Sequence, residues 1–254
     1  MTQLEPRLAA DQNSAQRLYI TGTDTGVGKT HVAQALLHAL AANGWQTAAM
    51  KPVASGCERI DGEWRNQDAQ ALQAAATLAR PYAEVNPYAL SEPTAPQIAA
   101  RRQQVSIELA PLCAAAERLA QDAELLLVEG VGGWLAPLSD QLMQAELARA
   151  LRCRVILVVG LRLGCLNHAL LSERAIRADG LPLLGWIGSA VDPELAHAED
   201  YHRLLEQHLD CPWLGSLPHQ ADAAQAAHAL DGRRLAALLT GSATGPAALK
   251  SPCA

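Results

Sequence analysis

The sequence contains no phenylalanine, and aromatic residues make up only 4% of its 254 positions. Half of the residues are nonetheless apolar, so the core of a folded domain has to be built from Leu, Val, Ile and Ala. Aliphatic side chains of this kind suit the buried strands of a parallel sheet. The length is sufficient for one large α/β domain and does not require two.

Further absences limit what the chain can do. It has no block of Lys or Arg and a net charge of −6, which removes the attraction on which non-specific nucleic-acid binding depends. Apolar runs such as 155–159 are far shorter than the roughly 20 residues that span a membrane, and the polar start has no signal-peptide core. The six cysteines form no Cys-x-x-Cys pair, which is typical of reduced thiols. We therefore expect a cytoplasmic protein with no nucleic-acid or membrane partner.

Strand-like and helical segments alternate along the middle of the chain. The strand-like runs are 17–22, 46–53, 124–130, 154–160, 183–191 and 212–218, and the helical segments are 29–43, 67–79, 106–121, 140–151, 166–179, 194–209 and 222–239. This alternation predicts an α/β fold with a doubly wound, mostly parallel sheet and helices on both faces. The polar start, 1–16, and the Pro/Gly-rich end, 241–254, predict a mobile extension and a mobile tail around a single domain, 17–240.

A glycine-rich phosphate loop follows the first predicted strand. The stretch GTDTGVGKT, 22–30, leads from a strand into a helix, where backbone amides bind phosphate groups. Lys29 is placed to reach the β- and γ-phosphates of a nucleotide, and the Thr30 hydroxyl to reach Mg²⁺. Five residues rather than the usual four separate Gly22 from Gly28, but the strand–helix context still favours a P-loop NTPase.

Three more residues are candidates for the chemistry. Glu129 ends a buried strand, where a carboxylate is costly without a partner, so it is a candidate Mg²⁺ ligand. Asp68 opens a predicted helix, and its residue type alone favours a helix N-terminal charge over a ligand. Lys51 closes the second predicted strand, at the same sheet edge as the phosphate loop. A lysine there is most often solvated, but a second lysine near a triphosphate also points to a second anionic reactant.

Several motifs together resemble one family, the dethiobiotin synthetases of biotin synthesis: GTDTGVGKT, KPVASG, RNQDA, NPYAL with EPTAP, VEGVGGWLAPLSD and VILVVGLRLGCLNHALL. The resemblance covers residues 17 to about 220. It implies a P-loop NTPase fold and a homodimer with the substrate site at its interface. The implied activity is an ATP- and Mg²⁺-dependent ligation of CO₂ to 7,8-diaminononanoate. In that family an amine captures CO₂ as a carbamate, the carbamate attacks the γ-phosphate, and the neighbouring amine displaces phosphate from the mixed anhydride.

The resemblance also implies roles for individual residues. Thr30, Asp68 and Glu129 would hold Mg²⁺. Lys29 would bind the phosphates, and Lys51 would stabilise the carbamate and the transferring phosphoryl group. The remaining nucleotide contacts implied in this way are Gly26, Val27, Gly28, His31, Gly130, Val131, Gly132, Ser189, Ala190, Leu217, Pro218 and His219. The implied substrate contacts are Thr25 and Ser55, and, from a helix N-terminus across the dimer interface, Gly164, Cys165, Leu166 and Asn167.

Two positions depart from the family pattern. Gly26 stands where familiar bacterial members carry Glu, and Ser189 with Ala190 stands where the family often has an Asn-Asp pair that reads adenine. We therefore expect weak selectivity among nucleoside triphosphates, and we expect Ser189→Asn to sharpen the preference for ATP.

Two other functions compete with this one. A regulatory or partitioning ATPase of the deviant P-loop type would need an extra loop lysine and often has an amphipathic tail, and neither is found. An amidotransferase of the cobyrinate type would need a glutaminase domain, for which no residues remain.

Overall fold

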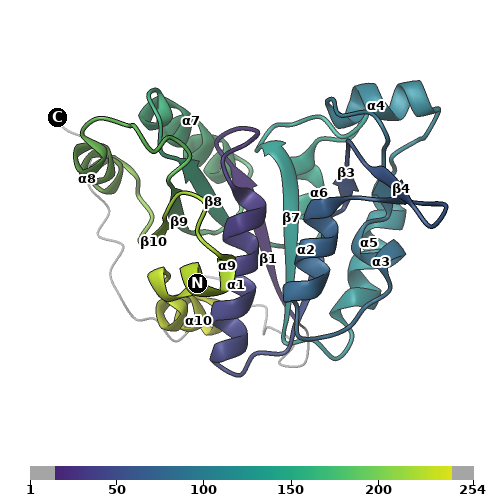
Figure 1. Ribbon diagram of the computed structural model, residues 1–254, viewed down its shortest axis with the longest axis horizontal. Coiled ribbons are helices and arrows are strands. Elements are labelled where there is room, and N and C mark those ends of the chain that lie inside the picture. The colour runs from purple at the N-terminus through teal and green to yellow at the C-terminus, as the bar shows by residue number, and fades with distance from the viewer. Residues whose placement is uncertain (1–14, 242–254) are drawn as a thin grey trace, which may run out of the picture.

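The computed structural model describes residues 15–241, and a six-stranded parallel sheet forms its centre. The strand order is β10-β9-β8-β1-β7-β2. From β1 the chain first builds the side with β7 and β2, and then returns to add β8, β9 and β10 on the other side, so the sheet is doubly wound (Figure 1). The strands are β1 (Gln16–Gly22), β2 (Thr47–Met50), β7 (Leu125–Gly133), β8 (Arg154–Gly160), β9 (Leu183–Ser189) and β10 (Trp213–Leu217). The predicted α/β fold is confirmed.

Helices cover both faces of this sheet. Successive residues of a strand point to opposite faces, so Leu126 and Val128 of β7 join one apolar core while Leu125 and Leu127 join the other. The first core is closed by α5 (Leu109–Ala120), α6 (Gln144–Ala150), α7 (Cys165–Ala178) and α8 (Ala198–His208). The second is closed by α1 (Lys29–Ala42), which crosses in front of the sheet in Figure 1, with α2 (Gln67–Ala75) and α10 (Gly232–Thr240).

Two predicted elements are each interrupted in the structure. The run 46–53 is not one strand, because β2 ends at Met50 and Pro52 has no N–H to continue the ladder. The chain then pairs β3 (Val53–Ala54) with β6 (Tyr88–Ala89) in a separate parallel sheet. The segment 222–239 is likewise broken into α9 (Ala223–Ala226), the 3₁₀ turn η1 (Ala227–Ala229) and α10. The break occurs where the Asp231 side chain accepts a hydrogen bond from the Arg234 N–H at 2.9 Å and caps a new helix.

Several smaller elements had no sequence prediction. They are the hairpin β4 (Glu58–Ile60) with β5 (Glu63–Arg65), the helix α3 (Tyr82–Val85) and the helix α4 (Pro96–Gln103). In the part of the chain that the structure describes, no helix is long and apolar enough to cross a membrane. The predicted extension and tail fall largely outside the described residues, although Gln16 already belongs to β1.

Candidate active site

The carboxyl ends of the parallel strands bring the phosphate loop and the predicted charged residues to one edge of the sheet. The loop joins the end of β1 to α1, and its Thr23 N–H donates to the Val158 carbonyl of the neighbouring β8 at 2.9 Å. Val27 packs so closely on β8 that a Cβ at Gly160 would lie 2.8 Å from its Cγ1 atom. Gly28 has a φ of +82° where α1 begins, and no side chain caps that helix end. The first amides of α1 are therefore available to an anion.

Lys29 is the buried cation of this loop. Its ammonium group donates to the backbone carbonyl of Asp24 at 2.9 Å, and the residue is 7% exposed. Burial, and then the positive charge of Lys51, lower the pKa of Lys29 from 10.5 to about 8. The negative charge of a bound phosphate would raise the pKa of Lys29 again, so the position of Lys29 suits an anionic ligand.

Lys51 is buried and forms an ionic cluster with two carboxylates, the buried Glu129 and the half-exposed Asp68. Its ammonium contacts Glu129 Oε1 and lies 3.2 Å from Asp68 Oδ2. Burial alone would lower the pKa of Lys51, but the charges of Glu129 and Asp68 outweigh it, and the pKa is raised. Lys51 therefore stays protonated at neutral pH.

The backbone around this cluster is fixed by the neighbouring segment 66–86. The Lys51 N–H donates to the Val85 carbonyl at 2.8 Å, and the Lys51 carbonyl accepts from the buried Asn86 amide at 2.7 Å. Asn66 caps α2 by accepting from the Ala69 N–H at 3.2 Å, which places Asp68 in the first helical turn. Asp68 is thus both a helix N-terminal charge and a partner of Lys51.

The oxygen groups beside Lys51 fit Mg²⁺. The Thr30 hydroxyl donates to Glu129 Oε1 at 2.8 Å, while Glu129 Oε2 is buried without a hydrogen-bond partner. Hydroxyl and carboxylate oxygens are the ligands that Mg²⁺ prefers, and it usually keeps water and nucleotide phosphates as the others. Within residues 15–241 no three His, Cys, Asp or Glu side chains are grouped to hold a metal. Such a cation would therefore need Thr30 and nucleotide oxygens in addition to Asp68 and Glu129.

The predicted nucleotide contacts 189–190 and 217–219 lie at the ends of β9 and β10. Ser189 is 4% exposed, and a Cβ at Gly28 would lie 2.5 Å from its Oγ atom, so its side chain packs under the phosphate loop. The Ala190 N–H donates to the Leu217 carbonyl at 3.0 Å, and His219 Nδ1 lies 2.9 Å from the Ala190 carbonyl oxygen. The two predicted stretches are therefore adjacent in space.

The predicted substrate contacts come from three places: the phosphate loop, the residue after β3, and the start of α7, which follows β8. Thr25 is exposed and Ser55 half-buried, directly after β3. At the start of α7, Gly164 has a φ of +93° and is the residue just before the helix. Cys165 is buried there, whereas Asn167 is exposed. This helix start, with Leu166, follows β8, the strand beside β1.

Sequence reasoning missed the residue that supports the segment after Glu129. Gln144 is fully buried, and its Oε1 atom accepts from the Val131 N–H at 2.5 Å. Its amide nitrogen donates to the Gly133 carbonyl at 2.8 Å. Gly130 has no room for a side chain, because a Cβ there would meet the Gln144 amide and lie 2.8 Å from Tyr19 Cε1. No local sequence signal marks Gln144, since Val131 and Gly133 are 13 and 11 positions away and its third partner, Thr21, is 123 positions away.

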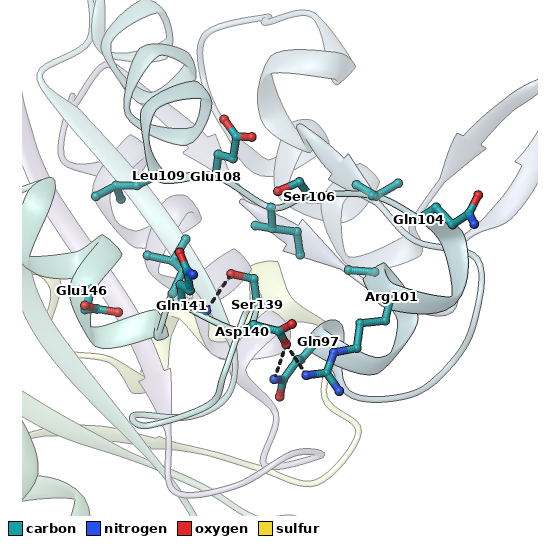
Figure 2. Close-up of a pocket in the computed structure, with 14 residues that line it drawn as sticks. Gln97, Arg101, Gln104, Ser106, Glu108, Leu109, Ser139, Asp140, Gln141 and Glu146 are labelled. Atoms are coloured by element: carbon teal, nitrogen blue, oxygen red, sulfur yellow. Dashed lines mark hydrogen bonds and ion pairs between the residues drawn. The ribbon is translucent and has the colours of Figure 1, made fainter.

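A cavity of about 790 Å³ between α4 and the segment 139–146 is not this site (Figure 2). Among the described residues, none of the predicted site residues lines it. Figure 2 shows Asp140 bonded to Gln97, at 2.7 Å, and to Arg101, at 2.5 Å. The Arg101 guanidinium is therefore already paired, and the phosphate loop remains the better anion site.

Comparisons with known proteins point to one family. A sequence family described as an AAA domain matches residues 16–227. The chain is 53% identical over 211 residues to an ATP-dependent dethiobiotin synthetase from Xanthomonas oryzae pv. oryzae, covering 83% of this chain and 94% of that protein. It is 52% identical over 206 residues to an ATP-dependent dethiobiotin synthetase from Xylella fastidiosa, covering 81% and 91%. The crystal structure of a DUF1611 family protein from Anabaena variabilis aligns with 94% of this chain and 61% of that one, with a TM-score of 0.52 at 14% identity, a likeness of fold alone.

Proposed function

The chain belongs to the ATP-dependent dethiobiotin synthetase family, ligases that form carbon–nitrogen bonds, and we propose that it makes dethiobiotin from 7,8-diaminononanoate, CO₂ and ATP. ADP and phosphate are the other products, and Mg²⁺ is required. The relatives supply the name of the activity. The diamine and CO₂ are taken from the family resemblance, and the metal and the residue roles are supported by the geometry of the sheet edge, as follows.

The observation that carries this proposal is the pair of buried lysines. Lys29 opens α1 and Lys51 follows β2, and they are close enough for the charge of Lys51 to lower the pKa of Lys29. Mg²⁺ held by Asp68 and Glu129 would take up the carboxylates that pair with Lys51 here, so the Lys51 ammonium would be left to contact a second anion beside the nucleotide. A carbamate made from an amine and CO₂ is such an anion.

In the proposed reaction, one substrate amine attacks CO₂ and loses a proton to give the carbamate. A carbamate oxygen attacks the γ-phosphorus of ATP, and the bond to ADP breaks. The second amine attacks the carbon of the resulting mixed anhydride, the bond to the phosphate oxygen breaks, and a proton is released as the urea ring closes. No protein nucleophile is needed, so catalysis rests on positioning and on offsetting charge.

Each charged residue has a distinct part in this scheme. Lys29 and the first amides of α1 hold the β- and γ-phosphates, while Lys51 holds the carbamate and the transferring phosphoryl group. Thr30, Asp68 and Glu129 would hold Mg²⁺, which when bound supplies further neutralisation of the phosphate charge. These assignments are consistent with the raised pKa of Lys51, because the group has to be cationic to act on developing negative charge.

We also propose a homodimer in which α7 of one subunit completes the substrate site of the other. Leu163, just before α7, is 81% exposed and Leu171, in the second turn of α7, is 56% exposed, so large apolar side chains face outward along a helix that borders the site. The amides at the start of α7 favour a carboxylate such as that of the substrate. A monomer with full activity would overturn this arrangement.

The deciding experiment measures phosphate release from MgATP with and without the diamine and bicarbonate. We expect release only when both are present, whereas release without the diamine would favour a regulatory or partitioning ATPase. Lys51→Gln should lower kcat about 10²–10³-fold, as loss of a group acting on the transition state does. Arg118→Gln, which breaks the exposed Arg118–Glu84 ion pair, is the matched control and should leave kcat unchanged. Near-normal turnover of Lys51→Gln would remove Lys51 from the mechanism.

A further inference from the structure

Asp24 of the phosphate loop is held by three different groups. Its backbone carbonyl accepts from the Lys29 ammonium at 2.9 Å. One carboxylate oxygen accepts from the Thr25 N–H at 2.7 Å and fixes the turn of the loop. The other lies 2.5 Å from a guanidinium nitrogen of Arg162, a residue 138 positions away. The conformation of the loop is therefore tied to a distant segment of the chain through one side chain.

Arg162 belongs to the short connection between β8 and α7. The Leu161 N–H donates to the Ser189 carbonyl at 2.8 Å, and the Cys165 N–H donates to the Arg162 carbonyl at 3.1 Å. The backbone on both sides of Arg162 is thus anchored, which gives its side chain a fixed origin at the start of α7. From there it reaches the phosphate loop that follows β1, the strand next to β8.

The contact between Arg162 and Asp24 affects ligand binding because Asp24 is negatively charged. A carboxylate within a loop that binds polyphosphate repels its ligand, since two negative charges are brought together in a partly desolvated place. The Arg162 side chain is 39% exposed and that of Asp24 is 47% exposed, so water screens the pair only in part. By pairing with Asp24, the guanidinium offsets the negative charge and also restrains the carboxylate that shapes the loop.

We propose that Arg162 is a positioning residue for nucleotide binding, which holds and neutralises Asp24 so that the phosphate loop accepts ATP. This inference rests on the proposed function only in taking the phosphate loop as the ATP-binding site. Arg162 acts through Asp24 and does not itself bind the phosphates. A consequence is that removing Arg162 is harmful only while Asp24 keeps its charge.

The test measures the dissociation constant of a non-hydrolysable ATP analogue with Mg²⁺, without diamine, for a set of variants. Arg162→Gln should weaken binding about fivefold, the fold-change that corresponds to one partly exposed ion pair. Arg162→Lys should stay within about twofold of the unmodified protein because it keeps a cation there. The double variant Arg162→Gln with Asp24→Asn should recover most of the lost affinity, since the repelling charge is gone.

Arg118→Gln serves as the control for loss of a half-exposed arginine, and its affinity should equal that of the unmodified protein. A double variant that binds as weakly as Arg162→Gln would show a direct contact with the nucleotide and overturn the proposal. Unchanged affinity in Arg162→Gln would overturn it as well. The proposed function fails by a different readout, namely phosphate release that ignores the diamine in the unmodified protein.

Discussion

Raising the pH from 7 to 9 should weaken nucleotide binding about tenfold, because Lys29 loses its proton near pH 8 in the ligand-free protein. The sign follows from linkage. Bound phosphates stabilise the ammonium form, so the pKa of Lys29 is higher in the complex than in the free protein. Above pH 8 binding must therefore take up a proton, and the affinity falls as the pH rises.

The magnitude follows from the lowered pKa. With a pKa of about 8, Lys29 is protonated in about nine-tenths of the free molecules at pH 7 and in about one-tenth at pH 9. The ratio corresponds to about 1.4 kcal/mol of binding free energy. Lys51 does not share this behaviour, because its carboxylate partners raise its pKa.

The sequence allows a direct assay, since it contains only three lysines, Lys29, Lys51 and Lys250. NMR of protein labelled at the lysine side chains should give three signals, each of which can be followed against pH. The signal that disappears in Lys29→Arg identifies Lys29. Calorimetric titration of the ATP analogue at pH 7, 8 and 9 then gives the affinities and the proton uptake.

Two outcomes would refute this reasoning. The first is a Lys29 signal that titrates near the ordinary lysine pKa of 10.5 in the ligand-free protein. The second is an affinity that stays constant between pH 7 and 9. Lys29→Arg provides the control, because a guanidinium keeps its charge throughout this range and its affinity should not change with pH.

Three further substitutions test other parts of the site. Glu129→Gln should raise the Mg²⁺ concentration needed for activity and lower the pKa of Lys51, because the amide is a poorer metal ligand and carries no charge; an unchanged Mg²⁺ titration would refute the ligand role. Ser189→Asn should weaken binding of ATP, CTP, GTP and UTP alike, instead of sharpening the preference for ATP as expected from the sequence alone, since the longer side chain has to displace Gly28 of the phosphate loop; a sharper preference for ATP would contradict this. Gly130→Ala should lower the free energy of unfolding by about 1–3 kcal/mol, seen in denaturant titration, because its Cβ would overlap the Gln144 amide.

The main strands could be predicted because a parallel sheet buried on both faces leaves continuous apolar runs in the sequence. The hairpin β4–β5 was missed although its signal was present. Asp61 and Gly62 both have positive φ, +52° and +84°, as an Asp-Gly turn between two short strands requires. Each strand has only three residues, and its single apolar side chain, Ile60 or Trp64, is exposed, so hydrophobic periodicity did not reveal them.

The ionic cluster was only partly accessible to sequence reasoning. Residue type made Lys51 a solvated strand end and Asp68 a helix charge, and only the family resemblance raised both. The structure places Lys51 between Glu129 and Asp68, at 4% exposure. A contact between residues 78 positions apart depends on the neighbouring positions of β2 and β7 in the sheet, which no local pattern contains.

Ser189 shows why residue type misleads at the end of a strand. Its position suggested a weak substitute for a base-reading Asn, but the side chain points under Gly28 instead. The main-chain groups of Ala190 could bind a base in place of a side chain, but both already have partners. The Ala190 N–H donates to the Leu217 carbonyl, and the Ala190 carbonyl contacts His219. A nucleobase that accepted from the Ala190 N–H would have to replace its bond to Leu217, which offsets what the base gains. We therefore predict weak discrimination among bases, because the Ala190 N–H is already engaged and an amide side chain is missing.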